Sequence, residues 1–186
     1  MEGFVKMSRL LSPLRRFRKA EDGNSTIEFV LLFPILMILF LSTVESGIMM
    51  LRHAMLERGV DMAMRSLRLG TDSPPTFDEL KAEICNYTGL IANCTDNLQV
   101  ELVEVNTTNW TLAVSDIRCI DRDSEIEPVT ETTYQPGASN SMMVVRVCAI
   151  VDPFFPATGL GSIMPVDATG GYALVTISSY VNEPGT

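Results

Sequence analysis

The chain has 186 residues, of which 46% are hydrophobic and 20% are charged, and its formal net charge is −9. This length suits one domain plus a membrane span. Because an acidic chain has no electrostatic attraction to a phosphate backbone, the composition excludes DNA or RNA as a partner.

The charges are spread unevenly along the chain. Residues 1–23 carry six Lys or Arg against three Asp or Glu, whereas residues 71–186 carry four against sixteen. Basic segments that flank a span stay on the cytoplasmic side of the membrane. We therefore expect residues 1–23 to be a cytoplasmic leader and the acidic part to lie outside the inner membrane.

The most apolar stretch runs from Phe29 to Leu51, and its first part, Phe29–Val44, contains no charged residue. As a helix it would be about 35 Å long, which suffices for a hydrocarbon core about 30 Å thick. A lone span has to be helical, because lipid offers its backbone no hydrogen-bond partners. A secretory signal does not fit, since the run is too long and no small-residue cleavage site follows it.

The helical pattern continues past this span. Apolar residues recur at close to helical spacing at Ile48, Leu51, Met55 and Met62. Gly70 and the prolines that follow it end the pattern. We expect a single helix of about 45 residues within 24–70, with its transmembrane part at 29–51.

Residues 71–186 predict a small α+β head. Thr76 and Glu79 have the spacing of a capping box, which predicts a short helix over Phe77–Tyr87. Four segments have the composition of strands: Leu98–Val105, Trp110–Ile117, Ser141–Val151 and Tyr172–Val181. A polar stretch between the first two, 106–109, suits a hairpin turn. The pattern indicates an antiparallel sheet of about four strands beside one or two helices.

All four cysteines, Cys85, Cys94, Cys119 and Cys148, lie in the part expected outside. In an oxidising compartment an even number of cysteines indicates disulfides, and four allow three connectivities. We favour Cys85–Cys94, which closes a short loop, and Cys119–Cys148, which joins two strand regions.

The sequence offers little for a metal, a cofactor or catalysis. His53 is the only histidine and no C-x-x-C motif occurs. The alternating acids of Asp121–Glu127 lack the glycine and the closing glutamate of a calcium loop, so we interpret them as a solvated loop. We expect no cofactor, no metal and no enzymatic activity.

Glu28 carries a carboxylate immediately before the apolar run. A charged side chain inside a bilayer costs about 2.5–3.5 kcal/mol or more, so it marks a functional site by default. Two interpretations stay open. The side chain is either solvated at headgroup level, or it pairs with a free α-amino group on a neighbouring subunit.

The N-terminal segment resembles that of type IV prepilins. A basic leader ends at Gly23, and a Glu28-Phe29 pair follows after four residues at the start of an apolar helix. The resemblance implies cleavage after Gly23 by a membrane-embedded prepilin peptidase. Asn24 would then be the new N-terminus, and Glu28, as the fifth mature residue, would take part in filament assembly.

More closely, the chain resembles the TadE/TadF-like minor pseudopilins of tight-adherence (Flp-type, type IVb/IVc) pilus systems. The shared features are the Glu-Phe pair, Pro34, a Glu-x-Gly element at Glu45–Gly47 and a terminal Tyr180-x-Asn-Glu-Pro. The two ends of the chain carry the likeness and the middle hardly any of it. Whether the chain is E-like or F-like, and whether it enters the pilus, stays open.

Glu45 lies about 25 Å along the helix from Glu28, near the expected outer face of the membrane. Its position is compatible with solvation at the interface and equally with a contact between subunits.

These features favour a minor pilus subunit that acts in pilus biogenesis and adhesion. The resemblance implies the membrane, the prepilin peptidase, other pilins and inner-membrane assembly proteins as partners. Its expected location is the bacterial inner membrane, in a single pass with a periplasmic head. The alternative is an uncleaved single-span protein whose head binds a ligand or senses a signal.

Overall fold

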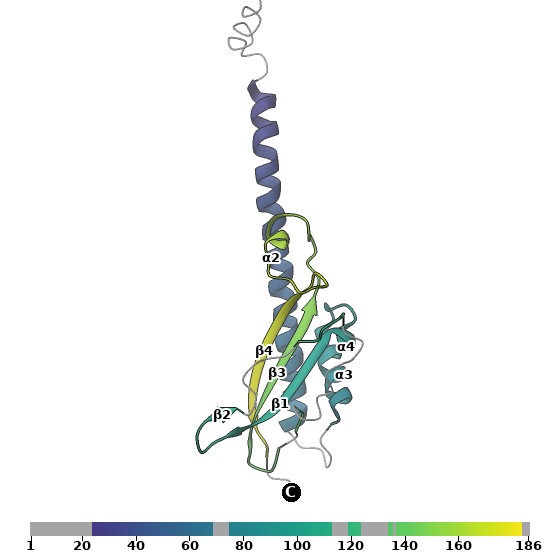
Figure 1. The fold of residues 1–186 in the computed structure, drawn as a ribbon, viewed down its shortest axis with the longest axis vertical. Coiled ribbons are helices and arrows are strands. Elements are labelled where there is room, and N and C mark those ends of the chain that lie inside the picture. The colour runs from purple at the N-terminus through teal and green to yellow at the C-terminus, as the bar shows by residue number, and fades with distance from the viewer. Residues whose placement is uncertain (1–23, 69–74, 113–118, 124–133, 136, 184–186) are drawn as a thin grey trace, which may run out of the picture. The chain divides into compact units, whose positions relative to one another are not determined.

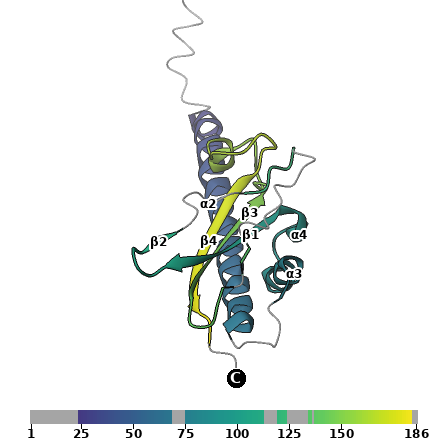
Figure 2. The same cartoon turned by 60° about the horizontal axis from the view of Figure 1, so that its bottom comes forward.

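The computed structural model describes residues 24–68, 75–112, 119–123, 134–135 and 137–183. The fold is α+β, as the sequence predicts. A long apolar helix is followed by a head that holds short helices, a four-stranded antiparallel sheet and two disulfides (Figures 1 and 2). The chain divides into two compact units, residues 1–40 and 41–186.

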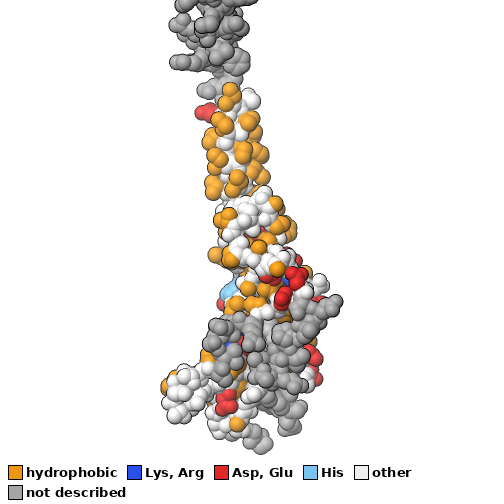
Figure 3. All heavy atoms as spheres, in the orientation of Figure 1, with side chains coloured by type: hydrophobic (Ala, Val, Ile, Leu, Met, Phe, Trp, Pro, Cys, Tyr) orange, Lys and Arg blue, Asp and Glu red, His pale blue; other side chains and the backbone are white. Residues whose placement is uncertain are grey.

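The longest element is α2 (Asn24–Arg68), which has the 45 residues expected for it. Large apolar side chains are exposed along its first part, as Figure 3 shows for one face. Of the described helices, α2 is long and apolar enough to cross a membrane. The last residues of the predicted span, 41–51, belong to the second unit.

Within the head, α2 buries one of its faces. Leu56, Val60 and Ala63 are almost fully buried, whereas Leu51 is 50% exposed. Apolar residues occupy more than one face of this helix, so their spacing alone does not identify the covered face. The small residues Gly59 and Ala63 lie on the side where other elements approach.

The sheet has the strand order β2-β1-β3-β4, and each neighbouring pair is antiparallel. Its strands are β1 (Leu98–Asn106), β2 (Thr111–Leu112), β3 (Met142–Val151) and β4 (Tyr172–Val181). β4 has the predicted bounds, and β1 and β3 differ from theirs by one residue. β2 is shorter than expected, and residues 113–118 lie outside the described part.

Two short helices precede β1 in the sequence. α3 (Phe77–Thr88) begins at the predicted capping box, in which Thr76 and Glu79 exchange hydrogen bonds of 2.8 and 3.4 Å. α4 (Cys94–Asn97) was not predicted, because four residues are too few to form a periodic pattern. The disulfide Cys85–Cys94 joins these two helices.

One face of the sheet forms the core with α2 and α3. The buried residues on this face alternate along each strand, as the two-residue period of a strand requires. They include Leu98, Val100, Leu102, Met143, Val145, Val147, Tyr172 and Leu174.

The opposite face of the sheet carries polar groups that are nevertheless buried. Arg146 and Glu101 form an ion pair of 2.6 Å there, with 4% and 1% of their side chains exposed. The second disulfide, Cys119–Cys148, lies on the same strand face. These are the two cysteine pairings favoured from the sequence.

Gly59 allows α2 and α3 to approach closely. A Cβ atom at this position would lie 2.8 Å from the carbonyl oxygen of Ile84 and would also press on the Thr88 side chain. At Gly47, on the same helix, a Cβ atom would meet nothing within 4 Å. Alanine substitutions at these two glycines therefore distinguish the effect of packing from the effect of helix propensity.

We expect Gly59→Ala to lower the free energy of unfolding of the head by about 1–2 kcal/mol. Alanine gains about 1 kcal/mol of helix propensity, but overpacking costs about 1–3 kcal/mol and here pushes against backbone. Gly47→Ala, the control, should raise stability by up to about 1 kcal/mol. Denaturant unfolding in detergent micelles measures both variants, and shifts in the same direction would contradict this account of Gly59.

Candidate functional site

The first candidate site is the start of α2. Glu28 lies on the exposed apolar segment, next to Phe29, whose ring stacks on Phe33 at 5.1 Å between centroids. No described residue forms an ion pair with Glu28. Gly23 and the leader lie outside the described residues, whereas Asn24 is the first residue of the helix.

The second candidate site is Glu45, which is fully buried in the head. Its two carboxylate oxygens accept hydrogen bonds from the successive backbone N–H groups of Phe154 (2.9 Å) and Phe155 (2.8 Å). Successive N–H groups that converge on one anion form a favourable site for negative charge, and bonds to an ionised acceptor are the strong ones. Glu45 thus occupies a site within its own chain, which is neither of the two interpretations drawn from the sequence.

We call residues 153–166, which connect β3 towards β4, the proline loop. It contains a single turn of 3₁₀-helix, η1 (Gly159–Ser162). The Leu160 N–H donates to the Ser42 Oγ (3.2 Å), and the Arg52 guanidinium donates to the Asp152 carbonyl (2.7 Å). Ser42, Glu45 and Arg52 are spaced three and seven residues apart, so they lie on one face of α2. They hold the start of the proline loop and its 3₁₀ turn against the helix.

His53 contributes one further polar contact between α2 and the sheet. Its Nε2 lies 3.1 Å from the carbonyl oxygen of Val175 on β4, and its Nδ1 lies 3.4 Å from the Glu57 carboxylate. The only histidine of the chain therefore fastens α2 beside β4. Among the described residues, no three His, Cys, Asp or Glu side chains are grouped so that they could hold a metal ion.

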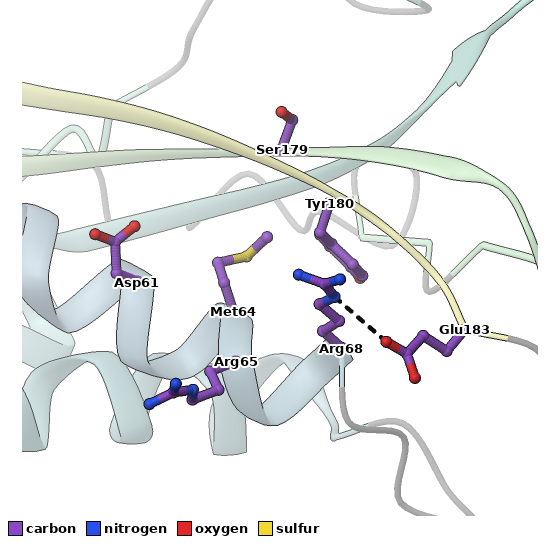
Figure 4. Close-up of a pocket in the computed structure, with 7 residues that line it drawn as sticks. All are labelled: Asp61, Met64, Arg65, Arg68, Ser179, Tyr180 and Glu183. Atoms are coloured by element: carbon purple, nitrogen blue, oxygen red, sulfur yellow. Dashed lines mark ion pairs between the residues drawn. The ribbon is translucent and has the colours of Figure 1, made fainter.

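The C-terminal residues that carry the family resemblance lie beside the end of α2 (Figure 4). Tyr180 and Glu183 line a groove of about 460 Å³ together with Asp61, Met64, Arg65, Arg68 and Ser179. Glu183 pairs with Arg68 at 3.4 Å, with both side chains largely exposed. An exposed pair of this kind contributes at most about 1 kcal/mol, so it orients the tail more than it stabilises the head.

Asn182 fixes the same tail to the turn before β3. Its backbone N–H donates to the Ser141 carbonyl (3.1 Å), and its side-chain amide donates to the Ala138 carbonyl (3.1 Å). The Asn140 N–H donates back to the Asn182 carbonyl (3.0 Å). Asn182 thus fastens the end of β4 to the turn before β3.

Two groups of the head have shifted pKa values with clear causes. Burial raises the pKa of Asp167, but hydrogen bonds from Thr169 and Gly171 and the charge of Arg122 outweigh it, so that this pKa is lowered overall. Burial raises the pKa of Tyr134 to about 12, and the charges that Tyr180 and Glu79 acquire on ionisation add to the effect. The Tyr134 hydroxyl donates to the carbonyl of Pro75 (2.6 Å).

The alternating acids singled out in the sequence lie only partly in the described residues. Asp121 accepts the backbone N–H of Asp123 at 3.1 Å, which is a local turn contact. Residues 124–127 lie outside the described part.

Residues 23–65 match the family model of TadE-like proteins. The chain carries a TadE-like domain. This segment contains both Glu28 and Glu45 and ends near the end of α2, so it includes about a quarter of the chain. The match relates this segment to TadE-like proteins of the Tad pilus system. Comparisons with curated proteins and with solved structures found no match.

The sequence pointed to Glu45 but not to its partners. The Glu-x-Gly element marked the residue, whereas Ser42, Arg52 and the amides of the proline loop were not singled out. One signal was present, since the loop joins two buried strands yet is uncharged and contains three prolines. A role of the Glu45 carboxylate in assembly stays a prediction.

We expect Glu45→Gln to destabilise the junction between α2 and the proline loop by about 2 kcal/mol. The amide keeps one acceptor oxygen but turns its NH₂ group toward a backbone donor, and a buried donor without a partner costs about 1–3 kcal/mol. Hydrogen exchange at the Phe154 and Phe155 amides should accelerate accordingly.

The matched control for this change is Asp61→Asn, an exposed acid on the same helix. It should leave exchange at both amides unchanged. Equal exchange rates in Glu45→Gln and in the unmodified protein would contradict the assignment of Glu45 as the acceptor.

We expect the head to lose stability as the pH rises from about 10 to about 12, because the phenol of Tyr134 ionises near pH 10 in the unfolded chain and near 12 in the fold. The neutral form is favoured in the fold, so this contribution is complete below the unfolded pKa and declines above it. Thermal unfolding as a function of pH measures the slope.

In this titration Tyr134→Phe should flatten the slope, and Tyr87→Phe, at an exposed tyrosine, should leave it unchanged. A slope that is the same in both variants would exclude Tyr134 as its source, and Tyr180, whose pKa burial also raises, would then be the candidate.

Proposed function

We propose that the TadE-like protein is a prepilin-like minor subunit of a Tad (Flp) pilus, cleaved after Gly23 by a prepilin peptidase and acting in pilus biogenesis and adhesion. The observation that carries the proposal is the position of Glu28. It is a carboxylate on an exposed, otherwise uncharged helical segment, at the fifth position after Gly23 and inside the family match.

The energetics of Glu28 favour a partner from another subunit. A carboxylate within a bilayer or a helical bundle needs an opposite charge or several donors. The described part of the chain supplies no cation to it. Cleavage after Gly23 would create an α-amino group on Asn24, one turn before Glu28. The amino group of a neighbouring subunit then neutralises the carboxylate during assembly.

The apolar surface around Glu28 suits the same role. Phe29, Phe33 and Leu36 are about half exposed or more, as are most of their neighbours on this segment. In the membrane these side chains face lipid, and in a filament they would pack against the helices of other subunits. The same surface therefore serves both the inserted and the assembled form.

The proposed orientation has the leader in the cytoplasm and the head in the periplasm. The basic residues of the leader support it through their preference for the cytoplasmic side. The two disulfides support it independently, because disulfides form and persist in oxidising compartments.

Cleavage is tested by the mass of the N-terminal peptide in cells that contain the peptidase. The proposal expects a mature chain that begins at Asn24. Gly23→Ala should accumulate the full-length precursor and abolish piliation, since the peptidase would meet a side chain where the motif has glycine before the cut. An intact leader in the unmodified protein would contradict the proposal and favour an uncleaved single-span protein.

Glu28→Gln tests the assembly step. It removes the charge and keeps the size, so the proposal expects impaired processing or piliation. Glu57→Gln is the matched control, because it makes the same chemical change at an exposed residue of the same helix beyond the cleavage motif, and it should leave the N-terminus processed. Normal maturation and normal pili in Glu28→Gln would overturn the role given to Glu28.

A further inference from the structure

The proline loop exposes apolar side chains without any charge among them. From Pro153 to Val166 the sequence contains no charged residue, and Asp152 and Asp167 flank this run. Phe154 is 60% exposed and Ile163 is 77% exposed. Large apolar side chains exposed together in one uncharged segment are typical of an interaction site.

The loop lies where the apolar segment enters the head. Phe40 is the last residue of the first unit, and Leu41 is the first of the second. The loop is bonded to Ser42 and Glu45, within two turns of that boundary. Because the chain is continuous, the loop is adjacent to the exit of the apolar segment whichever way the two units are oriented.

Along the helix, Glu28 and Glu45 are separated by less than the thickness of a membrane span. Seventeen residues separate Glu28 from Glu45, which corresponds to about 25 Å of helix, whereas the hydrocarbon core is about 30 Å thick. If Glu28 lies at one headgroup level, Glu45 lies at the edge of the hydrocarbon or inside it. An exposed carboxylate there would be costly, and Glu45 is fully buried with both oxygens bonded.

Part of the loop backbone also has hydrogen-bond partners within the protein, which suits a poorly hydrated environment. Non-helical backbone at membrane depth has to find its partners within the protein. Three loop residues are prolines, which have no N–H. Six further N–H groups donate to acceptors of the same unit, namely those of Phe154, Phe155, Thr158, Leu160, Ile163 and Met164.

We propose that the proline loop, Pro153–Val166, inserts its exposed side chains into the lipid interface of the leaflet next to the head. The loop and α2 then enter the membrane together, and the loop amides shield Glu45 at that depth. Lipid is the occupant rather than a protein, because the surface is uncharged, six of its eleven N–H groups donate to acceptors of the same unit, and the loop is bonded to the first residues of α2 that belong to the head.

The test places a single tryptophan on the loop. Trp110, the only tryptophan of the chain, is replaced in Trp110→Phe, and Ile163→Trp is added to it. The full-length protein is reconstituted in vesicles of phosphatidylethanolamine and phosphatidylglycerol, with and without lipids that carry a doxyl quencher high on the acyl chain. Ile177→Trp in the same background is the control, since Ile177 is 58% exposed on β4.

The proposal expects a blue-shifted emission for the tryptophan at position 163, strong quenching by the doxyl lipids and a several-fold lower sensitivity to aqueous iodide than at position 177. Phe154→Trp should behave like Ile163→Trp. Agreement between the two positions would show that the result is not a local effect of one substitution. Iodide sensitivity equal to that at position 177 would overturn the proposal. Protection from iodide without doxyl quenching would also overturn it, because a second copy of the chain would then cover the loop.

The inference rests on insertion of α2 in the membrane and goes beyond the proposed pilus function. Because the uncleaved precursor also carries α2, the measurement can be made on it. The result is therefore independent of whether Gly23 is a cleavage site.

Discussion

The buried carboxylate of Glu45 joins the long helix to the loop between the last two strands. Its two hydrogen bonds to successive backbone amides use the strongest kind of acceptor that a protein offers to N–H groups. Ser42 and Arg52 extend the same junction along the helix. The apolar contacts of Leu56 and Val60 follow further along that face. The polar junction therefore fixes where on α2 the head begins.

The sequence predicted most helices and strands well, because interactions between residues close in the sequence determine where these elements begin and end. The capping box at Thr76 placed α3 to within one residue, and alternation along Tyr172–Val181 gave β4 its bounds. The covered face of α2 could not be predicted, since several faces are apolar and the approach of α3 at Gly59 selects one. α4 was missed because a single turn after the left-handed Asn93 leaves no periodic signal.

The two candidate sites differ in how far they can be predicted from the sequence. Glu28 is defined by spacing from Gly23 and by the absence of charge around it, and both are properties of one local stretch. Glu45 is defined by amides about 110 residues away, and backbone donors leave no trace in the residue types that supply them. The sequence could thus mark Glu45 as unusual, yet it could not identify what binds the carboxylate.

The two disulfides bear on the order of events in the life of the subunit. Both join residues of the head, and Cys119–Cys148 ties β3 to a segment 29 positions earlier in the chain. In a reducing cytoplasm neither bond would persist. If the head is exported, oxidation of its thiols can be complete only after translocation, and full oxidation then marks a chain whose head has already crossed the bilayer.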